Sequence, residues 1–416
     1  MYICCFHTIY MNHMEKQYIP RPLYTERIKP FIGKPIIKVL TGQRRVGKSY
    51  IMFQLMDFIK DQNPSANIIY INCELEQFSH IRTNIDLNEY LKNKFSNEKE
   101  NYLFIDEIQE IASFQLTVRS LNAETKCDIF CTGSNATMLS GELATTLSGR
   151  YIEFNIHSLS YLEFLDFHQL EKGTESILKF LTYGGMPFLP VIGLTESLPF
   201  EYLKNVYSTI LLKDVIAREN IRNISFLENL VLYLADNVGS LFSANNISKF
   251  LKSQRIALST QLTINYLKAL TNAYFVHKVV RSEVGGLKIF EIGEKYYFED
   301  LGLRNTLKGF NQKTDIHKLL ENAVYLHLLQ SGFRIFIGKI DHREIDFVAD
   351  KNGLKIYVQV CLQLTDQSTA NREFGNLLLI KDNYPKYVVT FNDIIEGSDY
   401  QGIKQMNLVD FLLLEF

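Results

Sequence analysis

Residues 42–49 read GQRRVGKS, a G-x-x-x-x-G-K-S pattern in which two glycines frame a short loop. Glycine tolerates a tight turn, so the backbone N–H groups of such a loop can point at phosphate oxygens. Lys48 can then reach the β- and γ-phosphates, and the Ser49 hydroxyl can hold Mg²⁺. The residues expected to contact the nucleotide are Gly42, Gln43, Arg44, Arg45, Val46, Gly47, Lys48, Ser49 and Tyr50.

The sequence on both sides of this loop supports the same interpretation. Residues 36–40, IIKVL, are apolar and β-branched, which predicts a buried strand. Apolar residues then recur at helical spacing from Ile51 to Lys60. A strand, a glycine loop and a helix place the phosphates at the helix N-terminus, where the backbone favours anions. A chance glycine turn is the alternative.

The composition describes a folded globular protein. The chain has 416 residues, of which 46% are hydrophobic and 22% are charged, and this length predicts about three domains. The net charge of −2 gives no global electrostatic case for nucleic acid, so any DNA-binding surface must be local. No apolar run reaches the ~18 residues that a membrane span needs.

The cysteines and the N-terminus indicate a cytoplasmic protein. None of the six cysteines forms a C-x-x-C pair, and Cys73, Cys127, Cys131 and Cys361 lie in apolar, strand-like contexts typical of reduced core thiols. No signal peptide is recognisable. Residues 1–13 match no targeting segment, and Met14 is a candidate translation start.

A second motif lies at residues 101–111, NYLFIDEIQEI. The apolar part predicts a strand, and Asp106 and Glu107 follow at its carboxyl end, as in a Walker B motif. Asp106 would hold Mg²⁺ through water, and Glu107 would orient or deprotonate the attacking water. The alternative is an ordinary strand that runs into an acidic helix N-terminus.

Two further segments complete the predicted site. Residues 68–72 and 128–132 are strand candidates, and the second ends in Gly133, Ser134 and Asn135. Ser134 or Asn135 would lie between the two Walker strands and sense the γ-phosphate, although Asn135 could simply cap the next turn. Arg150 is a candidate arginine finger, acting in its own chain or on a neighbouring subunit, and an ordinary surface arginine is the alternative.

The segments RRVGKS, IDEIQ, TGSNATMLSGELATTLSGR and SLSYLEFLDF together resemble the AAA+ ATPases of bacteria and archaea that carry an additional C-terminal domain of unknown function. The resemblance runs from about Arg21 to the end of the chain. It implies a five-stranded parallel αβα sheet, ATP and Mg²⁺ as ligands, and a sensor role for the turn at Ser134 and Asn135. The segment 183–187, YGGMP, matches a short family motif, for which only a turn between helices is predicted.

The middle of the chain predicts a winged helix-turn-helix. Residues 243–251 begin with small capping residues, residues 259–270 form an amphipathic pattern, and two strand candidates at 275–280 and 287–292 flank Gly285 and Gly286. The third helix would present polar side chains to DNA, with local positive charge beside them; these residues are Ser259, Thr260, Gln261, Thr263, Asn265, Lys268, Lys252, Arg255, Lys278 and Arg281. A protein-docking or lid element is the alternative.

The last part of the chain resembles a PD-(D/E)xK nuclease core. A helix with Glu321 precedes strand candidates at 333–337, 344–348 and 355–361. The resemblance implies Glu321 and Asp346 as metal ligands, but the third strand has Gln359 and Cys361 where an acid and a lysine are expected. Lys355 is too far along the strand to substitute simply. A non-catalytic nuclease-like fold is therefore predicted.

The sequence thus predicts an α/β protein with a P-loop AAA+ core, a helical and winged-helix middle and a restriction-endonuclease-like C-terminal domain. The expected division is a tail at 1–20, the ATPase core at 21–157, a helical lid at 158–235, a winged helix at 236–294 and the nuclease-like domain at 295–416. The expected activity is Mg²⁺-dependent ATP hydrolysis in a switch or motor that acts on double-stranded DNA or a protein client, with a homo-oligomer as one option. The alternatives are an ATP-regulated DNA-binding regulator with little turnover and a nucleotide-gated nuclease.

Overall fold

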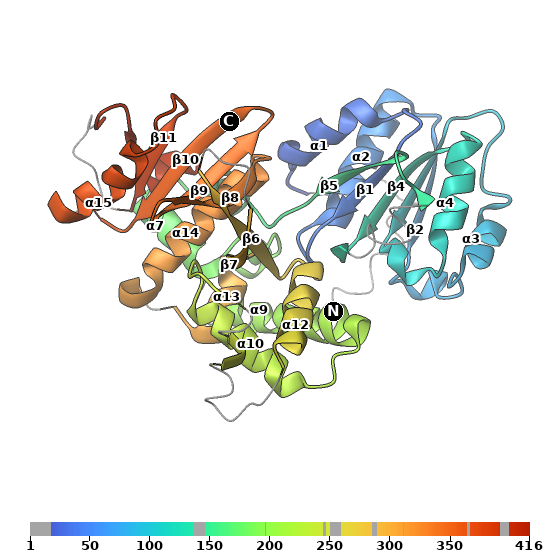
Figure 1. Ribbon diagram of the computed structural model, residues 1–416. Coiled ribbons are helices and arrows are strands. Elements are labelled where there is room, and N and C mark those ends of the chain that lie inside the picture. The colour runs from blue at the N-terminus through green and yellow to red at the C-terminus, as the bar shows by residue number, and fades with distance from the viewer. Residues whose placement is uncertain are drawn as a thin grey trace.

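The computed structural model describes residues 18–136, 146–195, 197–243, 247–249, 259–284, 289–310, 312–363, 367–391 and 399–416. None of the helices within these ranges is long and apolar enough to cross a membrane. Figure 1 shows two sheet-containing lobes, the N-terminal one in blue to teal and the C-terminal one in orange to red, with helices below and between them.

The N-terminal lobe is built on a five-stranded sheet in the order β2-β3-β4-β1-β5, and all neighbouring strands are parallel. Its strands are β1 (Ile37–Thr41), β2 (Asn67–Asn72), β3 (Asn101–Asp106), β4 (Asp128–Gly133) and β5 (Tyr151–Asn155). The predicted parallel αβα sheet is therefore confirmed. Strand β4 separates β1 from β3, so the carboxyl ends of the two motif-bearing strands flank that of β4.

Helices and turns cover both faces of this sheet, and alternate residues of a strand point to opposite faces. Leu40, Phe104 and Phe130 enter one hydrophobic cluster, and Val39 and Ile105 enter the other. The covering helices and turns are α1 (Pro22–Ile28), η1 (Lys29–Phe31), α2 (Lys48–Gln62), η2 (Glu76–Phe78), α3 (Asn84–Leu91), η3 (Ile108–Glu110) and α4 (Phe114–Ala123). The predicted helix after the glycine loop is α2.

A helical region follows the sheet. It contains α6 (Tyr161–His168), α7 (Thr174–Tyr183), α8 (Leu189–Ile192), α9 (Leu198–Thr209), the π-helical η5 (Ile210–Ala217), α10 (Ile224–Asp236) and α12 (Thr260–Asn272). The GGMP segment is the predicted turn, between α7 and α8. Its Gly184 has a φ of +73°, and a Cβ there would lie 2.4 Å from the Asp300 carboxylate, which explains the glycine.

The C-terminal lobe contains a seven-stranded sheet in the order β12-β11-β10-β9-β8-β6-β7. Its strands are β6 (Val276–Glu283), β7 (Ile289–Phe298), β8 (Arg334–Ile340), β9 (Arg343–Lys351), β10 (Leu354–Cys361), β11 (Lys386–Thr390) and β12 (Lys404–Asn407). Its helices are α13 (Leu301–Lys308), α14 (Gln312–Gln330), α15 (Gln367–Leu378) and α16 (Leu408–Phe411). The predicted helix with Glu321 is α14, and the three predicted strands are β8, β9 and β10.

A separate winged-helix unit is not confirmed. The two expected wing strands are β6 and β7, but β6 also pairs in parallel with β8, so this hairpin forms the edge of the C-terminal sheet. The expected boundary after residue 294 falls inside β7. Of the expected first two helices, residues 244–246 and 250–258, which include Lys252 and Arg255, lie outside the described residues, as do Gly285 and Gly286.

The predicted recognition face of α12 is partly wrong. Ser259, Gln261, Asn265 and Lys268 are exposed, but Thr263 is fully buried. The Thr263 hydroxyl donates to the Ser259 carbonyl, a local hydrogen bond that lets a polar side chain face the interior.

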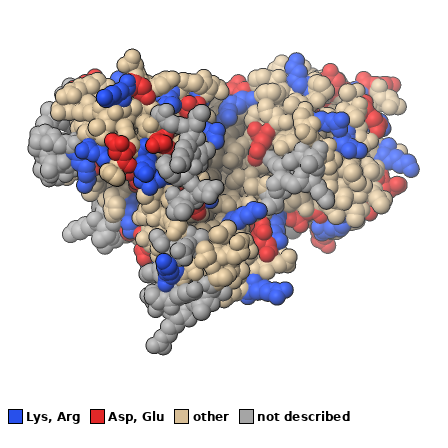
Figure 2. Space-filling model, viewed as in Figure 1, with Lys and Arg blue, Asp and Glu red and all other residues tan. Residues whose placement is uncertain are grey.

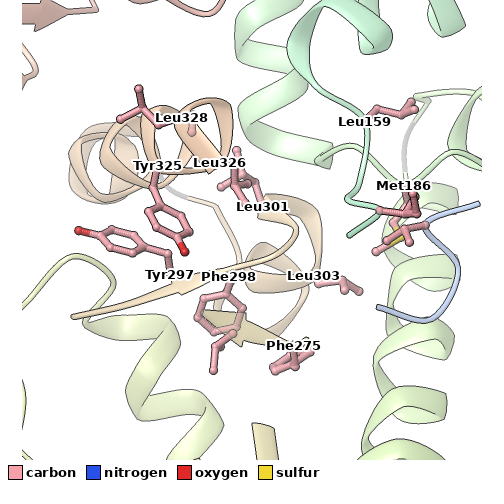
Figure 3. Packing of buried hydrophobic residues seen from close by; sticks show 14 of the residues in the cluster. Leu159, Met186, Phe275, Tyr297, Phe298, Leu301, Leu303, Tyr325, Leu326 and Leu328 are labelled. Atoms are coloured by element: carbon pink, nitrogen blue, oxygen red, sulfur yellow. The ribbon is translucent and has the colours of Figure 1, made fainter. Parts of the chain in front are cut away.

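One continuous hydrophobic cluster joins the two lobes. It includes residues of the first sheet, of the middle helices and of the last sheet, and Figure 3 shows part of it around Leu159, Met186, Phe275, Phe298 and Leu301. Leu159 also donates its backbone N–H to the Gly185 carbonyl, at 2.7 Å. The exit from the first sheet is thereby packed directly against the GGMP turn and the helices behind it.

Candidate nucleotide site

The glycine loop has the backbone that its sequence predicts. Gly42 has a φ of +141°, and a Cβ on it would lie 2.0 Å from the Ile156 carbonyl oxygen. Gly47 is left-handed at +96° and directly precedes α2. Both positions therefore require glycine, the first because of close backbone approach and the second because of its dihedral angles.

Lys48 is 4% exposed, and its ammonium group lies inside the loop. Its Nζ donates to the carbonyl oxygens of Gly42 and Gln43, at 3.0 Å each, and lies 3.8 Å from Glu107 Oε1. Burial lowers the pKa of Lys48, while the nearby carboxylates of Glu107 and Asp106 act to raise it. A buried ammonium group at this place is suited to a strongly anionic ligand.

Asp106 closes β3 and is 2% exposed. It accepts hydrogen bonds from Thr132 on β4, from Tyr70 at 3.2 Å, and from Ser49 at the start of α2. Burial and the neighbouring Glu107 charge raise its pKa. Ser49 and Asp106 thus present a hydroxyl and a carboxylate oxygen side by side, and oxygen ligands of this kind fit Mg²⁺.

Glu107 is held in a fixed position beside this pair. Its backbone has a φ of +56°, and its N–H donates to the Thr132 hydroxyl oxygen at 2.8 Å. Its carboxylate accepts hydrogen bonds from Ser134 at 2.9 Å and from Gln109. Burial acts to raise the pKa of Glu107, but Lys48 and Arg44 hold it below the usual value, so the carboxylate is a charged acceptor.

Ser134 joins the predicted site. It follows β4 and is fully buried, and its hydroxyl bridges Glu107 and Asp214 Oδ1, the second at 3.4 Å. Asn135 is also buried, at 2% exposure, in the same turn. Both side chains therefore lie at the carboxyl edge of the sheet, between the ends of β1 and β3.

Arg150 is not brought to this site in its own chain. It is exposed, and its carbonyl accepts from Ile37 N–H at the amino end of β1. The glycine loop follows the opposite end of the same strand. Since β1 spans Ile37–Thr41, the whole strand separates Arg150 from the loop. Tyr50, on the first turn of α2, is 47% exposed.

Three further residues at the site, Asp214, Arg218 and Arg21, were not predicted from the sequence. Arg44 makes two bonds to Asp214, with Nε to Oδ2 at 2.9 Å and Nη2 to Oδ1 at 3.2 Å. Arg218 donates to the Ser134 hydroxyl at 3.3 Å. Arg21 is 2% exposed, pairs with Glu163 at 2.8 Å and donates to the Val46 carbonyl at 2.8 Å. For Asp214, the only local signal in the sequence was an aspartate within the otherwise mostly apolar segment 210–217, ILLKDVIA.

A second polar centre lies in the C-terminal lobe. The ammonium of Lys295, on β7, lies 2.8 Å from Glu321, 2.9 Å from Glu344 and 3.8 Å from Asp346. Tyr297 donates to Glu321 at 2.6 Å, and Asp346 Oδ2 accepts from Val360 N–H at 2.8 Å. Gln359 is buried on the adjacent strand. The expected position of the lysine is on β10, whereas the cation that reaches these acids comes from β7.

Comparison with known proteins places the core in a recognised class. Residues 34–165 match the family model described as an AAA domain, and residues 174–314 match a domain of unknown function, DUF8612. Among solved structures, Cdc6p from Pyrobaculum aerophilum is similar with a TM-score of 0.31 and 13% identity, over 70% of this chain and 95% of that one. AMPPCP-bound DnaA from Aquifex aeolicus has a TM-score of 0.30 and 15% identity, over 61% and 93%.

Two curated proteins are similar over most of the chain. An uncharacterized protein of Haemophilus influenzae is 35% identical over 406 residues, which are 96% of this chain and 100% of the relative. The uncharacterized protein MJ1544 of Methanocaldococcus jannaschii is 31% identical over 377 residues, 86% of this chain and 82% of the relative. The chain therefore belongs to the family of these two uncharacterized proteins, and its residues 34–165, which include the glycine loop, match an AAA domain.

Proposed function

We propose that this protein hydrolyses ATP and uses the energy as a switch or motor on DNA or a protein client. The observation that carries the proposal is the convergence of Lys48, Glu107 and Ser134 at the carboxyl ends of three adjacent strands. Glu107 is a charged acceptor beside the phosphate-binding lysine, where a base or water-orienting group is required. Ser49 and Asp106 would hold Mg²⁺, which would neutralise phosphate charge.

Measurements of ATP binding and turnover on the same preparations test this proposal. Lys48→Ala should lower turnover by at least ~100-fold, because the site loses its main charge contact with the transferred phosphate. Lys60→Ala, which removes an exposed lysine near the other end of the same helix, is the matched control and should retain turnover. Full turnover in Lys48→Ala would place hydrolysis elsewhere and overturn the proposal.

The client is proposed to be double-stranded DNA or a protein. Four exposed polar side chains support a DNA contact: Ser259, which caps α12, and Gln261, Asn265 and Lys268 on that helix. Acidic and basic side chains are mixed over the face shown in Figure 2, as far as the described residues extend, which supports only a local contact. Turnover measured with and without duplex DNA separates the options, since a DNA motor is stimulated, whereas a regulator binds ATP tightly with little turnover.

We propose that Arg150 acts in catalysis on a neighbouring subunit. Its exposure at the far end of β1 supports a role in trans rather than in its own site. Mixing Arg150→Ala with Lys48→Ala subunits tests this. Where the two variants meet, one subunit supplies Lys48 and its neighbour supplies Arg150, so turnover should reappear. If the mixture assembles into an oligomer but remains as inactive as each variant alone, Arg150 does not act on a neighbouring subunit.

One observation favours a second candidate function, metal-dependent cleavage of phosphodiester bonds in the C-terminal lobe. Lys295 supplies, from β7, the positive charge that β10 lacks, next to Glu321, Glu344 and Asp346. Burial, followed by the charge of Glu321, raises the pKa of Asp346 well above its usual range. The same three ion pairs oppose this candidate, because Lys295 already neutralises part of the charge that would attract a divalent ion.

Incubation of the protein with duplex DNA, Mn²⁺ or Mg²⁺ and ATP tests the second candidate. Cleavage that disappears in Asp346→Ala and persists in Lys48→Ala would establish a C-terminal nuclease centre. Absence of cleavage under all these conditions would leave the ATPase as the proposed activity. Asp350→Ala, further along the same strand β9, is the matched control for loss of an acidic residue.

A further inference from the structure

Two histidines and one glutamate converge where the two lobes meet. His157 lies two residues beyond β5 of the first sheet, His277 lies on β6, and Glu299 directly follows β7. Glu299 Oε2 lies 3.0 Å from His157 Nδ1 and 2.6 Å from His277 Nε2. The three possible ligand atoms all lie within 4.8 Å of one another. Segments that are far apart in the sequence thus bring three side chains that commonly bind metal ions to one point.

The hairpin of β6 and β7 aligns two of these side chains. His277 is paired with Tyr297 across the antiparallel ladder, and Glu299 follows two residues after Tyr297. The Glu299 N–H donates to the Phe275 carbonyl at 3.3 Å, which continues the pairing beyond the end of β7. His277 and Glu299 are therefore diagonal neighbours on one face of the hairpin, close enough for their side chains to meet.

Hydrogen bonds from the segment around His157 fix the orientation of the carboxylate. The Ser158 N–H donates to Glu299 Oε1 at 2.8 Å, and the Ser158 hydroxyl donates to the Glu299 carbonyl oxygen at 2.8 Å. Because Oε1 is held in this way, Oε2 is turned toward both imidazoles. The His157 N–H donates to the Tyr24 hydroxyl oxygen at 3.1 Å, which anchors the same segment to α1. Supporting hydrogen bonds of this kind orient the ligands in metal sites.

The burial of Glu299 requires a positive charge at this point. Glu299 is 1% exposed and His157 is 4% exposed. Burial acts to raise the pKa of Glu299, but His157, followed by His277, holds it at about 2, so the carboxylate is ionised. A buried carboxylate needs a compensating cation. One protonated imidazole would be enough for that, whereas a second imidazole meets the same oxygen. A single metal ion that binds all three groups explains both the charge and the convergence.

We propose that His157, His277 and Glu299 bind a divalent transition-metal ion, and that Zn²⁺ is the ion they fit best. Zinc takes imidazole nitrogen and carboxylate oxygen as ligands, and sites with two histidines and one glutamate leave a fourth position for water. Tetrahedral ligation at ~2.0 Å separates the ligand atoms by ~3.3 Å, so the two short contacts need to open by less than ~1 Å. Each histidine then carries its proton on the other ring nitrogen.

The ion would fasten the first sheet to the last one. It would tie the segment that leaves β5 to the hairpin of β6 and β7, in addition to the hydrophobic cluster that the lobes share. His157 and Glu299 are 142 residues apart in the chain, so the three ligands come together only in the folded state. Binding therefore stabilises the fold, whether or not the protein hydrolyses ATP.

Titration of the untagged full chain with Zn²⁺, after treatment with a chelator and its removal, tests the inference. The wild type should bind one Zn²⁺ per chain in calorimetry, and its thermal midpoint should rise by ~3 °C when Zn²⁺ is ~100-fold above Kd. His277→Ala should weaken binding by at least ~100-fold, because a lost ligand costs more than the ~10–100-fold of a lost supporting group. His342→Ala, at an exposed position, is the matched control and should bind Zn²⁺ as the wild type does.

Two outcomes of the titration would overturn the inference. One is a wild-type protein that neither binds Zn²⁺ stoichiometrically nor is stabilised by it, which would leave a protonated imidazole as the partner of Glu299. The other is His277→Ala that binds Zn²⁺ as tightly as the wild type, which would place the ion elsewhere. If His277→Ala does not fold, the visible spectrum of the wild type with Co²⁺ decides. Intense bands of a four-coordinate ion are expected, and the weak bands of a six-coordinate ion count against the site.

Discussion

Gly42 shows most clearly how a single residue sets the geometry of the nucleotide site. We predict that Gly42→Ala loses ATP binding and destabilises the fold by ~2–4 kcal/mol, because its Cβ would lie 2.0 Å from the Ile156 carbonyl oxygen and the loop must move. Calorimetric titration with ATP and chemical denaturation measure the two effects.

Gly33→Ala is the matched control for this substitution. Gly33 also has a positive φ, of +75°, but no atom lies within 4 Å of its would-be Cβ. It should therefore lose only ~1 kcal/mol from backbone strain and should bind ATP as the wild type does. Equal losses of binding in the two variants would mean that strain, and not the contact with Ile156, explains the requirement for glycine.

Site residues were predictable from the sequence where they belong to one contiguous motif. Lys48, Ser49, Asp106 and Glu107 belong to contiguous motifs, so their spacing alone indicates phosphate and metal contacts. Asp214 lies 170 residues beyond its partner Arg44. Because a pairing over that distance depends on how whole elements pack, no local pattern could identify it.

The hairpin of β6 and β7 illustrates the same limit at the scale of elements. Its two strands were recognisable from their alternation and from the glycines between them, but a winged-helix hairpin and the edge of a larger sheet have the same pattern. The partner that decides between them is β8, whose paired residues 337–339 lie more than fifty positions after Arg281, Ser282 and Glu283. Lys295, which β7 carries to Glu321, was missed for the same reason.

Helix α14 makes the C-terminal lobe sensitive to acid through His327. The ring is half-buried against Phe411 and Phe416, and its Nε2 is shielded from solvent with no hydrogen-bond partner among the described residues. Burial lowers the pKa of His327 to about 4. The unfolded chain therefore binds a proton between pH 6.5 and 4 that the folded chain does not, so stability is full above pH ~6.5 and is lost as the pH falls.

We predict that protonation of His327 in the unfolded chain lowers the free energy of unfolding by up to ~3 kcal/mol between pH 7 and pH 4. His327→Phe should make this dependence shallower without abolishing it, because burial also lowers the pKa of His168 to about 4. Stability at pH 7 should be nearly unchanged, as measured by urea denaturation at a series of pH values. His342→Phe, at an exposed position, should keep the wild-type slope. An identical slope in wild type and His327→Phe would show that another group causes the acid sensitivity.

At the scale of the whole molecule, the two lobes share one hydrophobic core. The same cluster contains Tyr24 of α1, Phe164 of α6, Phe298 of β7 and Leu412 near the end of the chain. We therefore predict one cooperative thermal transition in scanning calorimetry, in place of separate transitions for the N-terminal and C-terminal lobes. Two well-separated transitions in the wild type would contradict a shared core.

A substitution of Leu159, between the first sheet and the helical region, extends this prediction. Leu159 is 1% exposed where the first sheet leads into the helical region, and Figure 3 places it beside Met186. Leu159→Ala should lower stability by ~2–5 kcal/mol without splitting the transition, because the cavity lies inside the shared core. Leu162→Ala, at a side chain that is 47% exposed, is the control and should change little.

The rate of ATP hydrolysis in Glu107→Gln tests whether Glu107 makes the site in the AAA domain a hydrolytic one. The amide keeps the shape of the side chain but loses the charge beside Lys48 and Ser134. We predict that turnover falls by at least ~100-fold while ATP binding is retained. Turnover at the wild-type rate in Glu107→Gln would show that Glu107 is neither the base nor the water-orienting group of this site.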